Sequence, residues 1–271
     1  MRIAHKFIFD RDSRFRPMRK EFDLDHPDPK DHLAKNWRNE QSFYELALLE
    51  FVRLYGPTGG TFFDVGANVG NHTIFLASMV ADCVVSVEPC PEALFALRQN
   101  IAKNKLSNCL TVDCAVGDRT GQAALNVRAE NSHNLGSTSV QARRDCEEKT
   151  VQTKTLDRIW SDISEATKGA LKYIKLDIEG AELPALRGGA DILQRYAPHV
   201  SAEAASSEEL DALCKYLYDF GYVKVGCFGA TPHYYFINPE KRPLSGDLST
   251  PMCKIIRCAS QRVWKLCEYF G

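Results

Sequence analysis

Short continuous apolar runs alternate with segments in which apolar residues recur every three or four positions. The short runs are typical of buried strands, and the longer period is typical of amphipathic helices. The pattern predicts strands at residues 61–65, 83–87, 109–116, 123–127, 172–178 and 199–204, and a hairpin at 222–228 and 234–237. It predicts helices at residues 39–55, 71–81, 91–104, 155–164, 182 to about 188, and 207–220. This alternation predicts a doubly wound α/β sheet that closes with an antiparallel pair.

Three segments depart from this alternation. Residues 1 to about 36 mix both charges with three prolines and show no sustained period, which predicts an arm or an irregular cap. Residues 128–150 are polar and predict either a lid over a binding site or a mobile insertion. Residues 251–270 predict a basic amphipathic helix that docks on its own domain or lies on a membrane. We therefore expect an N-terminal arm at 1–38, one domain at 39–240 and a helical extension at 241–271, with the arm or the extension as a surface for a protein partner.

Composition narrows the class of protein. A chain of 271 residues with 44% hydrophobic residues is long enough for one large core. Charged residues interrupt residues 1–12, and no apolar run reaches membrane-spanning length, so we expect a soluble cytoplasmic protein without a signal peptide. The net charge of -1 argues against a broad nucleic-acid surface. Ten cysteines without a C-x-x-C spacing favour buried free thiols.

The chemistry is predicted around T-F-F-D-V-G-A-N-V-G-N-H-T at 61–73. Gly66 and Gly70 follow a strand directly and permit a sharp turn and close approach of a ligand to the next helix. Asn68 stands where a dinucleotide fingerprint has its middle glycine, and Asp64 lies at the strand end. A carboxylate there suits a ligand with a cationic end, such as the ammonium and sulfonium of S-adenosylmethionine.

Acidic residues also mark the ends of the other predicted strands. They are Glu88, Asp113, Asp177 with Glu179, and Glu203. One such acid is most often solvated or caps a helix, but five beside a glycine turn predict a binding edge. Glu88 is suited to accept hydrogen bonds from the two hydroxyls of a ribose.

Four motifs in order resemble the FkbM family of class I S-adenosylmethionine-dependent methyltransferases. They are D-V-G-A-N-V-G-N-H-T at 64–73, S-V-E-P at 86–89, A-V-G-D-R-T-G at 115–121 and Y-I-K-L-D-I-E-G-A-E at 173–182. The resemblance covers about residues 44–238. It implies a Rossmann-like, seven-stranded, mostly parallel sheet with an antiparallel last strand, and O-methylation of a hydroxyl on a sugar or glycosylated metabolite. The implied cofactor-binding residues are Asp64, Gly66, Ala67, Asn68, Gly70, Asn71, Glu88, Asp113, Ala115, Val116 and Asp177.

Methyl transfer to an alcohol needs a group that removes the hydroxyl proton. The candidate catalytic residues are Asp177, Glu179 and Glu203, with His72, His133 and His233 as alternatives. Mg²⁺ bound by Asp177 and Glu203 is a second route, although the sequence shows no dense ligand cluster that requires a metal.

Two other functions stay open at this point. A catalytically silent binding or assembly module would keep the fold without turnover, and calorimetry with S-adenosylmethionine separates it in part. A nicotinamide-dependent oxidoreductase is disfavoured by Asn68 and by the D-I-E-G group at 177–180.

Overall fold

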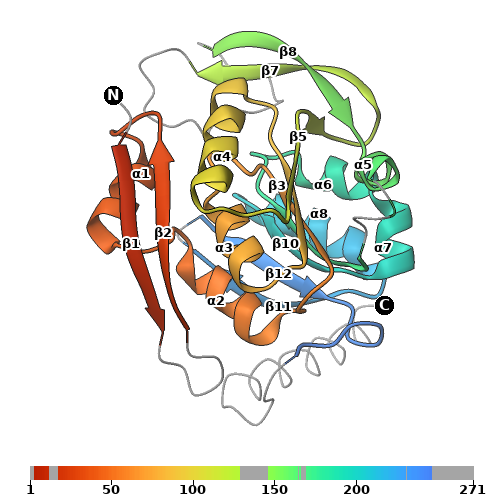
Figure 1. Ribbon diagram of the computed structural model, residues 1–271. Helices are drawn as coiled ribbons and strands as arrows, with labels where there is room; N and C mark the ends of the chain where they lie inside the picture. The colour runs from red at the N-terminus through yellow and green to blue at the C-terminus, as the bar shows by residue number, and fades with distance from the viewer. Residues whose placement is uncertain are drawn as a thin grey trace.

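The computed structural model describes residues 3–11, 18–128, 146–163, 165, 169–229 and 231–245. Its centre is a seven-stranded sheet with the order β11-β12-β10-β9-β3-β4-β5 (Figure 1). The strands are β3 (Thr61–Val65), β4 (Cys83–Val87), β5 (Cys109–Val112), β9 (Leu171–Leu176), β10 (His199–Glu203), β11 (Val223–Phe228) and β12 (His233–Ile237). β12 runs antiparallel to both of its neighbours, β10 and β11, and the other neighbouring strands of this sheet are parallel. The predicted mostly parallel sheet with an antiparallel last strand is confirmed.

Helices cover both faces of the sheet (Figure 1). Successive strand residues point to opposite faces, so Phe62 belongs to one buried core and Phe63 to the other. The first core includes side chains of α2 (Leu46–Tyr55), α3 (Asn71–Met79) and α4 (Pro91–Lys103). The second core includes side chains of α5 (Leu156–Asp162), α6 (Glu182–Arg187), α7 (Ala190–Tyr196) and α8 (Ser207–Tyr218).

The prediction of irregular structure for residues 1 to about 36 is wrong. β1 (Ile3–Arg11) and β2 (Met18–His26) form an antiparallel pair, and α1 (His32–Glu40) follows. Phe22 of β2 and Trp37 of α1 are fully buried in the first core, and the Phe22 ring lies 4.8 Å from that of Phe43. Asn100 of α4 also hydrogen-bonds the backbone N–H and C=O of Asp25. The sequence did not predict β2 because Phe22 and Leu24 are its only buried apolar residues in the described part. Two apolar positions among charged residues are too few to show the alternation that is typical of a strand.

Several predicted boundaries also change. The single strand predicted at 109–116 is two strands in the structure, β5 and β6 (Ala115–Val116). β6 forms a three-stranded sheet with β8 (Cys146–Lys154) and β7 (Gly121–Arg128). The predicted polar loop at 128–150 therefore ends in strand, and residues 129–145 lie outside the described part. The helix predicted at 39–55 starts at Leu46, and α7 was not predicted because Gly188 and Gly189 indicated a helix end.

Six cysteines of the described part are free thiols, namely Cys83, Cys90, Cys109, Cys114, Cys214 and Cys227. None of the helices in the described ranges has the length and apolar content that crossing a membrane requires. The predicted C-terminal helix at 251–270 lies outside the described residues.

Candidate functional site

A cavity of about 270 Å³ opens at the carboxyl ends of β3, β9 and β10. Its wall includes seven residues predicted from sequence as ligand-binding or catalytic, namely Gly66, Ala67, Asn68, Asn71, Asp177, Glu179 and Glu203. The wall also includes His72 and His233, which the sequence offered as alternative bases. The predicted binding edge thus encloses a hollow in the folded chain.

The turn after β3 has an unusual backbone. Gly66, Asn68 and Gly70 have φ values of 77°, 48° and 99°. A Cβ on Gly66 would lie 1.8 Å from the backbone O of Asp177, and one on Gly70 would lie 2.7 Å from Cδ1 of Leu97. Glycine is therefore required at Gly66 because the backbone of Asp177 leaves no space for a Cβ, and it is favoured at Gly70 chiefly because of the positive φ. Ligand approach alone does not explain either glycine. Gly70 does not line the cavity.

Glu88 follows β4 and fixes this turn. Its Oε2 accepts the backbone N–H of Asn68 at 2.8 Å, and its Oε1 accepts that of Cys90 at 2.8 Å. Burial raises the pKa of Glu88 to about 7, although both hydrogen bonds oppose that shift. Its carboxyl group does not line the cavity, so its contact with a ribose stays a prediction.

Asp64 is completely buried and also lies outside the cavity wall. Its Oδ2 accepts the hydroxyl of Thr73 at 2.6 Å, and its Oδ1 lies 3.4 Å from Nζ of Lys175. Lys175 in turn donates to the backbone O of Gly66 and lies 3.2 Å from Oδ2 of Asp177. The predicted direct contact of Asp64 with a ligand remains untested, and the geometry shows that Asp64 holds Lys175 beside the turn.

Asp177 and Glu203 lie at the ends of adjacent strands and share a hydrogen bond. Burial first, and the Asp177 charge second, raise the pKa of Glu203 to about 9. Burial opposes ionisation of Asp177 too, but Lys175 and then His233 hold the pKa of Asp177 well below its usual value. The two pKa values thus move in opposite directions, so the pair as a whole holds one proton at neutral pH. Glu179 lines the same cavity with a φ of 54°.

Glu45 and two histidines, His72 and His233, also line the cavity. Nε2 of His72 lies 3.3 Å from Oε2 of Glu45, and Nε2 of His233 lies 3.6 Å from Oε1. Burial holds the pKa of His72 well below its usual value and lowers that of His233 to about 4. Burial and then Asp177 raise the pKa of Glu45 to about 8. Both imidazoles are thus neutral in the folded protein at neutral pH.

Asn71 lines the cavity, but its side chain is bonded to the N-terminal segment. Its Oδ1 accepts the indole N–H of Trp37 at 2.9 Å and the backbone N–H of Tyr44 at 3.0 Å, and its Nδ2 donates to the Tyr44 C=O. These bonds fix the chain between α1 and α2 over the cavity. A contact of Asn71 with the cofactor stays a prediction.

The remaining predicted cofactor residues lie away from the cavity. Asp113 is exposed after β5, whereas Ala115 and Val116 are buried in β6. The structure therefore does not bring these three residues to the cavity, and their contact with an adenine stays untested. His133 lies outside the described residues.

Sequence reasoning missed five polar residues of the wall. They are His32, Tyr44, Glu45, Lys175 and Thr231. Lys175 could have been found, because it is the one cation in the apolar run Y-I-K-L at 173–176. Glu45 carries no comparable pattern, since it precedes α2 and reaches the cavity only through tertiary packing.

A comparison with families of known proteins gives one match. The methyltransferase FkbM domain matches residues 64–224, which is more than half of the chain. No curated protein matches the sequence.

Two solved structures resemble the fold. Methyltransferase FkbM from Methylobacillus flagellatus KT is 22% identical with a TM-score of 0.48, and the match covers 66% of this chain and 43% of that one. Precorrin-6y C5,15-methyltransferase from Geobacter metallireducens GS-15 is 15% identical with a TM-score of 0.43, over 71% of this chain and 85% of that one. The chain spans less than half the length of the first of these relatives. Both TM-scores are below 0.5, so the assignment depends on the domain match, and by that match the chain belongs to the FkbM family of methyltransferases.

Proposed function

We propose that this protein transfers a methyl group from S-adenosylmethionine to a hydroxyl of a sugar or glycosylated metabolite. The observation that carries the proposal is the cavity, which sets the carboxyl groups of Asp177 and Glu203 beside the Gly66 turn. Family membership supports methyl transfer in general. The acidic wall supports a cationic donor and a hydroxyl acceptor, because carboxylates attract a sulfonium and accept hydroxyl hydrogen bonds.

The chain fits the donor at the turn after β3. Gly66, Ala67 and Asn68 line the cavity, and the buried Oδ1 of Asn68 has no hydrogen-bond partner among the described residues. An unsatisfied buried oxygen favours a bound ligand with an N–H or O–H group. S-adenosylmethionine supplies a methyl carbon already activated by its sulfonium. We assign Glu88 to the ribose, and we assign Asp64 to an indirect role through Lys175.

Asp177 is the carboxylate best placed to accept the proton of the acceptor hydroxyl. It lies in the cavity wall next to the turn, and the Lys175 ammonium orients it from 3.2 Å. As the carbon–sulfur bond breaks and the oxygen–carbon bond forms, the hydroxyl proton passes to Asp177. The side chain of Glu203 is hydrogen-bonded to Asp177 and positions the Asp177 carboxylate. Tyr44 and Thr231 of the same wall offer hydroxyls that suit a sugar.

The test combines calorimetry with methyl-labelled S-adenosylmethionine and a panel of hydroxyl-bearing sugars and glycosylated metabolites. We expect binding of the donor, and labelling of one acceptor class that Asp177→Asn slows at least ~100-fold when the donor is saturating. Asp191→Asn, which removes an exposed carboxylate on α7, serves as the control. Absence of donor binding refutes the proposal, and binding without transfer to any acceptor favours the silent module.

A further inference from the structure

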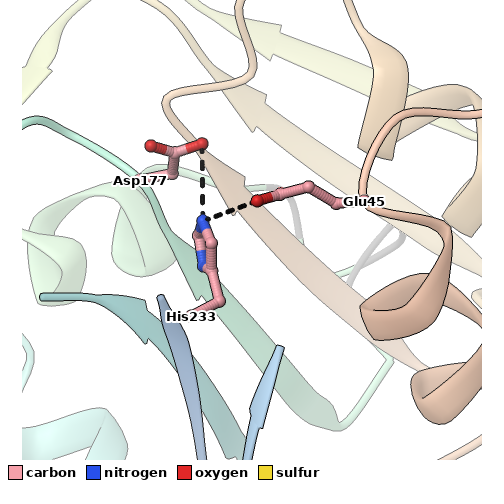
Figure 2. A group of neighbouring side chains, drawn as sticks. All are labelled: Glu45, Asp177 and His233. Carbon is pink, nitrogen blue, oxygen red and sulfur yellow. Dashed lines mark ion pairs between the residues drawn. The ribbon is translucent and has the colours of Figure 1, made fainter. Parts of the chain in front are cut away.

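Three potential metal ligands meet at one point of the cavity. Figure 2 shows that His233 of β12 points toward Glu45, which precedes α2, and toward Asp177, which follows β9. Nε2 of His233 lies 3.6 Å from Oε1 of Glu45 and 3.8 Å from Oδ2 of Asp177. One ligand atom from each residue lies within 4.8 Å of the other two. Segments far apart in the sequence thus bring two carboxylates and an imidazole together.

The hydrogen bonds of this group are incomplete. The side chains of Glu45 and His233 are only 4% and 1% exposed. Within the described residues, Oε2 of Glu45 and Nε2 of the adjoining His72 lie 3.3 Å apart without the geometry of a hydrogen bond. Nδ1 of His233, the ring nitrogen that does not face Glu45 and Asp177, has no hydrogen-bond partner there either. All three residues line the cavity. Buried polar groups in native proteins are normally satisfied, so several unsatisfied groups around one hollow favour a bound polar species.

The ligand types and their spacing favour a metal ion over another occupant. Two ligands that each lie ~2.1 Å from an ion and subtend a tetrahedral angle are ~3.4 Å apart, so the two measured separations need only small side-chain movements. Carboxylates suit Mn²⁺, and an imidazole suits transition metals better than Mg²⁺. Lys175, 3.2 Å from Asp177, offsets part of the negative charge. The carboxylate of Asp64 lies 3.4 Å from the same Lys175 ammonium and offsets part of its positive charge.

We propose that Glu45, Asp177 and His233 bind one divalent first-row transition-metal ion. This ligand set differs from the Asp177 and Glu203 pair suggested by the strand ends. The inference rests on the proposed function in one respect only: an ion at this point would hold the oxygen of an acceptor hydroxyl beside the Gly66 turn. Metal binding itself is measured without donor or acceptor, so its failure is distinguishable from failure of the methyl-transfer proposal.

The experiment titrates the chelator-treated full-length protein with Mn²⁺ and follows free Mn²⁺ by electron paramagnetic resonance. We expect one saturable site, weakened at least ~10-fold in Glu45→Gln and in His233→Asn. Glu182→Gln is the matched control, because Glu182 is a buried carboxyl on α6 that accepts the backbone N–H of Ile178 and lies outside the cavity wall. This control should keep wild-type affinity.

A second measurement needs no variant. Electron spin-echo modulation of Mn²⁺ bound to the wild-type protein should show coupling to the nitrogen of one imidazole. Absence of nitrogen coupling, absence of binding below ~1 mM, or equal binding by wild type, Glu45→Gln and His233→Asn would each overturn the site.

Discussion

Gly66→Ala is the sharpest test of why a glycine follows β3. An added Cβ would lie 1.8 Å from the backbone O and 2.9 Å from the backbone C of Asp177, and the residue has a φ of 77°. Ordinary contact begins near 3.4 Å, so the ends of β3 and β9 would have to separate by ~1.6 Å. The neighbouring atoms are backbone, which cannot rotate away as a side chain can.

The cost follows from two separate effects. Positive φ in a residue with a Cβ costs ~1–2 kcal/mol, and overpacking of a closed site costs ~1–3 kcal/mol. We therefore expect Gly66→Ala to lower the free energy of unfolding by ~2–5 kcal/mol. It should also weaken donor binding, since Asp177 moves with its backbone.

Urea unfolding followed by circular dichroism measures this change. Gly121→Ala is the matched control, because a Cβ there meets no atom within 4 Å, and we expect a change within ~0.5 kcal/mol. A loss below ~0.5 kcal/mol for Gly66→Ala, with donor binding also reduced, would refute the packing argument and restore ligand approach as the reason for the glycine.

Three further predictions concern the cavity wall and the core. Asn71→Ala should lower the free energy of unfolding by ~2–4 kcal/mol and speed proteolysis near Tyr44, because it leaves Trp37 and the Tyr44 backbone without their partner. Glu88→Gln should weaken S-adenosylmethionine binding at least ~10-fold by calorimetry, because an amide cannot accept both backbone N–H groups. His199 should make the protein less stable in acid, because burial lowers its pKa from 6.5 to about 4. The unfolded chain takes up that proton first, so stability present above pH 6.5 falls by ~3 kcal/mol as the pH drops to about 4, measured by urea unfolding.

Each of these predictions has its own contrary result. Unchanged proteolysis of Asn71→Ala would mean that packing alone holds the N-terminal segment. Wild-type affinity in Glu88→Gln would remove Glu88 from the donor site. For His199, the variant His199→Asn is the comparison, and equal loss of stability in variant and wild type between pH 6.5 and 4.5 would show that other groups cause the acid effect.

Much of the central sheet could be predicted from the sequence. Continuous apolar runs such as residues 61–65 and 83–87 are buried on both faces, so their strand character depends little on the rest of the chain. The turn at Gly66 and the acids at Asp177 and Glu203 follow those strands directly. Their meeting at one sheet edge was therefore predictable from strand order alone.

The part of the site contributed by other segments required the tertiary structure. Glu45 precedes a helix and reaches His233 only because α2 packs on the sheet. The two residues are far apart in the sequence, so no local pattern of apolar and polar positions predicts their contact. Asp64 has the residue type predicted for ligand contact, yet its burial beside Thr73 and Lys175 was decided by the packing of α3 on β3. Local sequence determined which segments form strands and which residues end them, because backbone propensity and burial period act over a few residues. Side-chain partners across the cavity were decided only by the folded chain, because electrostatic and hydrogen-bond contacts depend on distances between segments that the sequence does not contain.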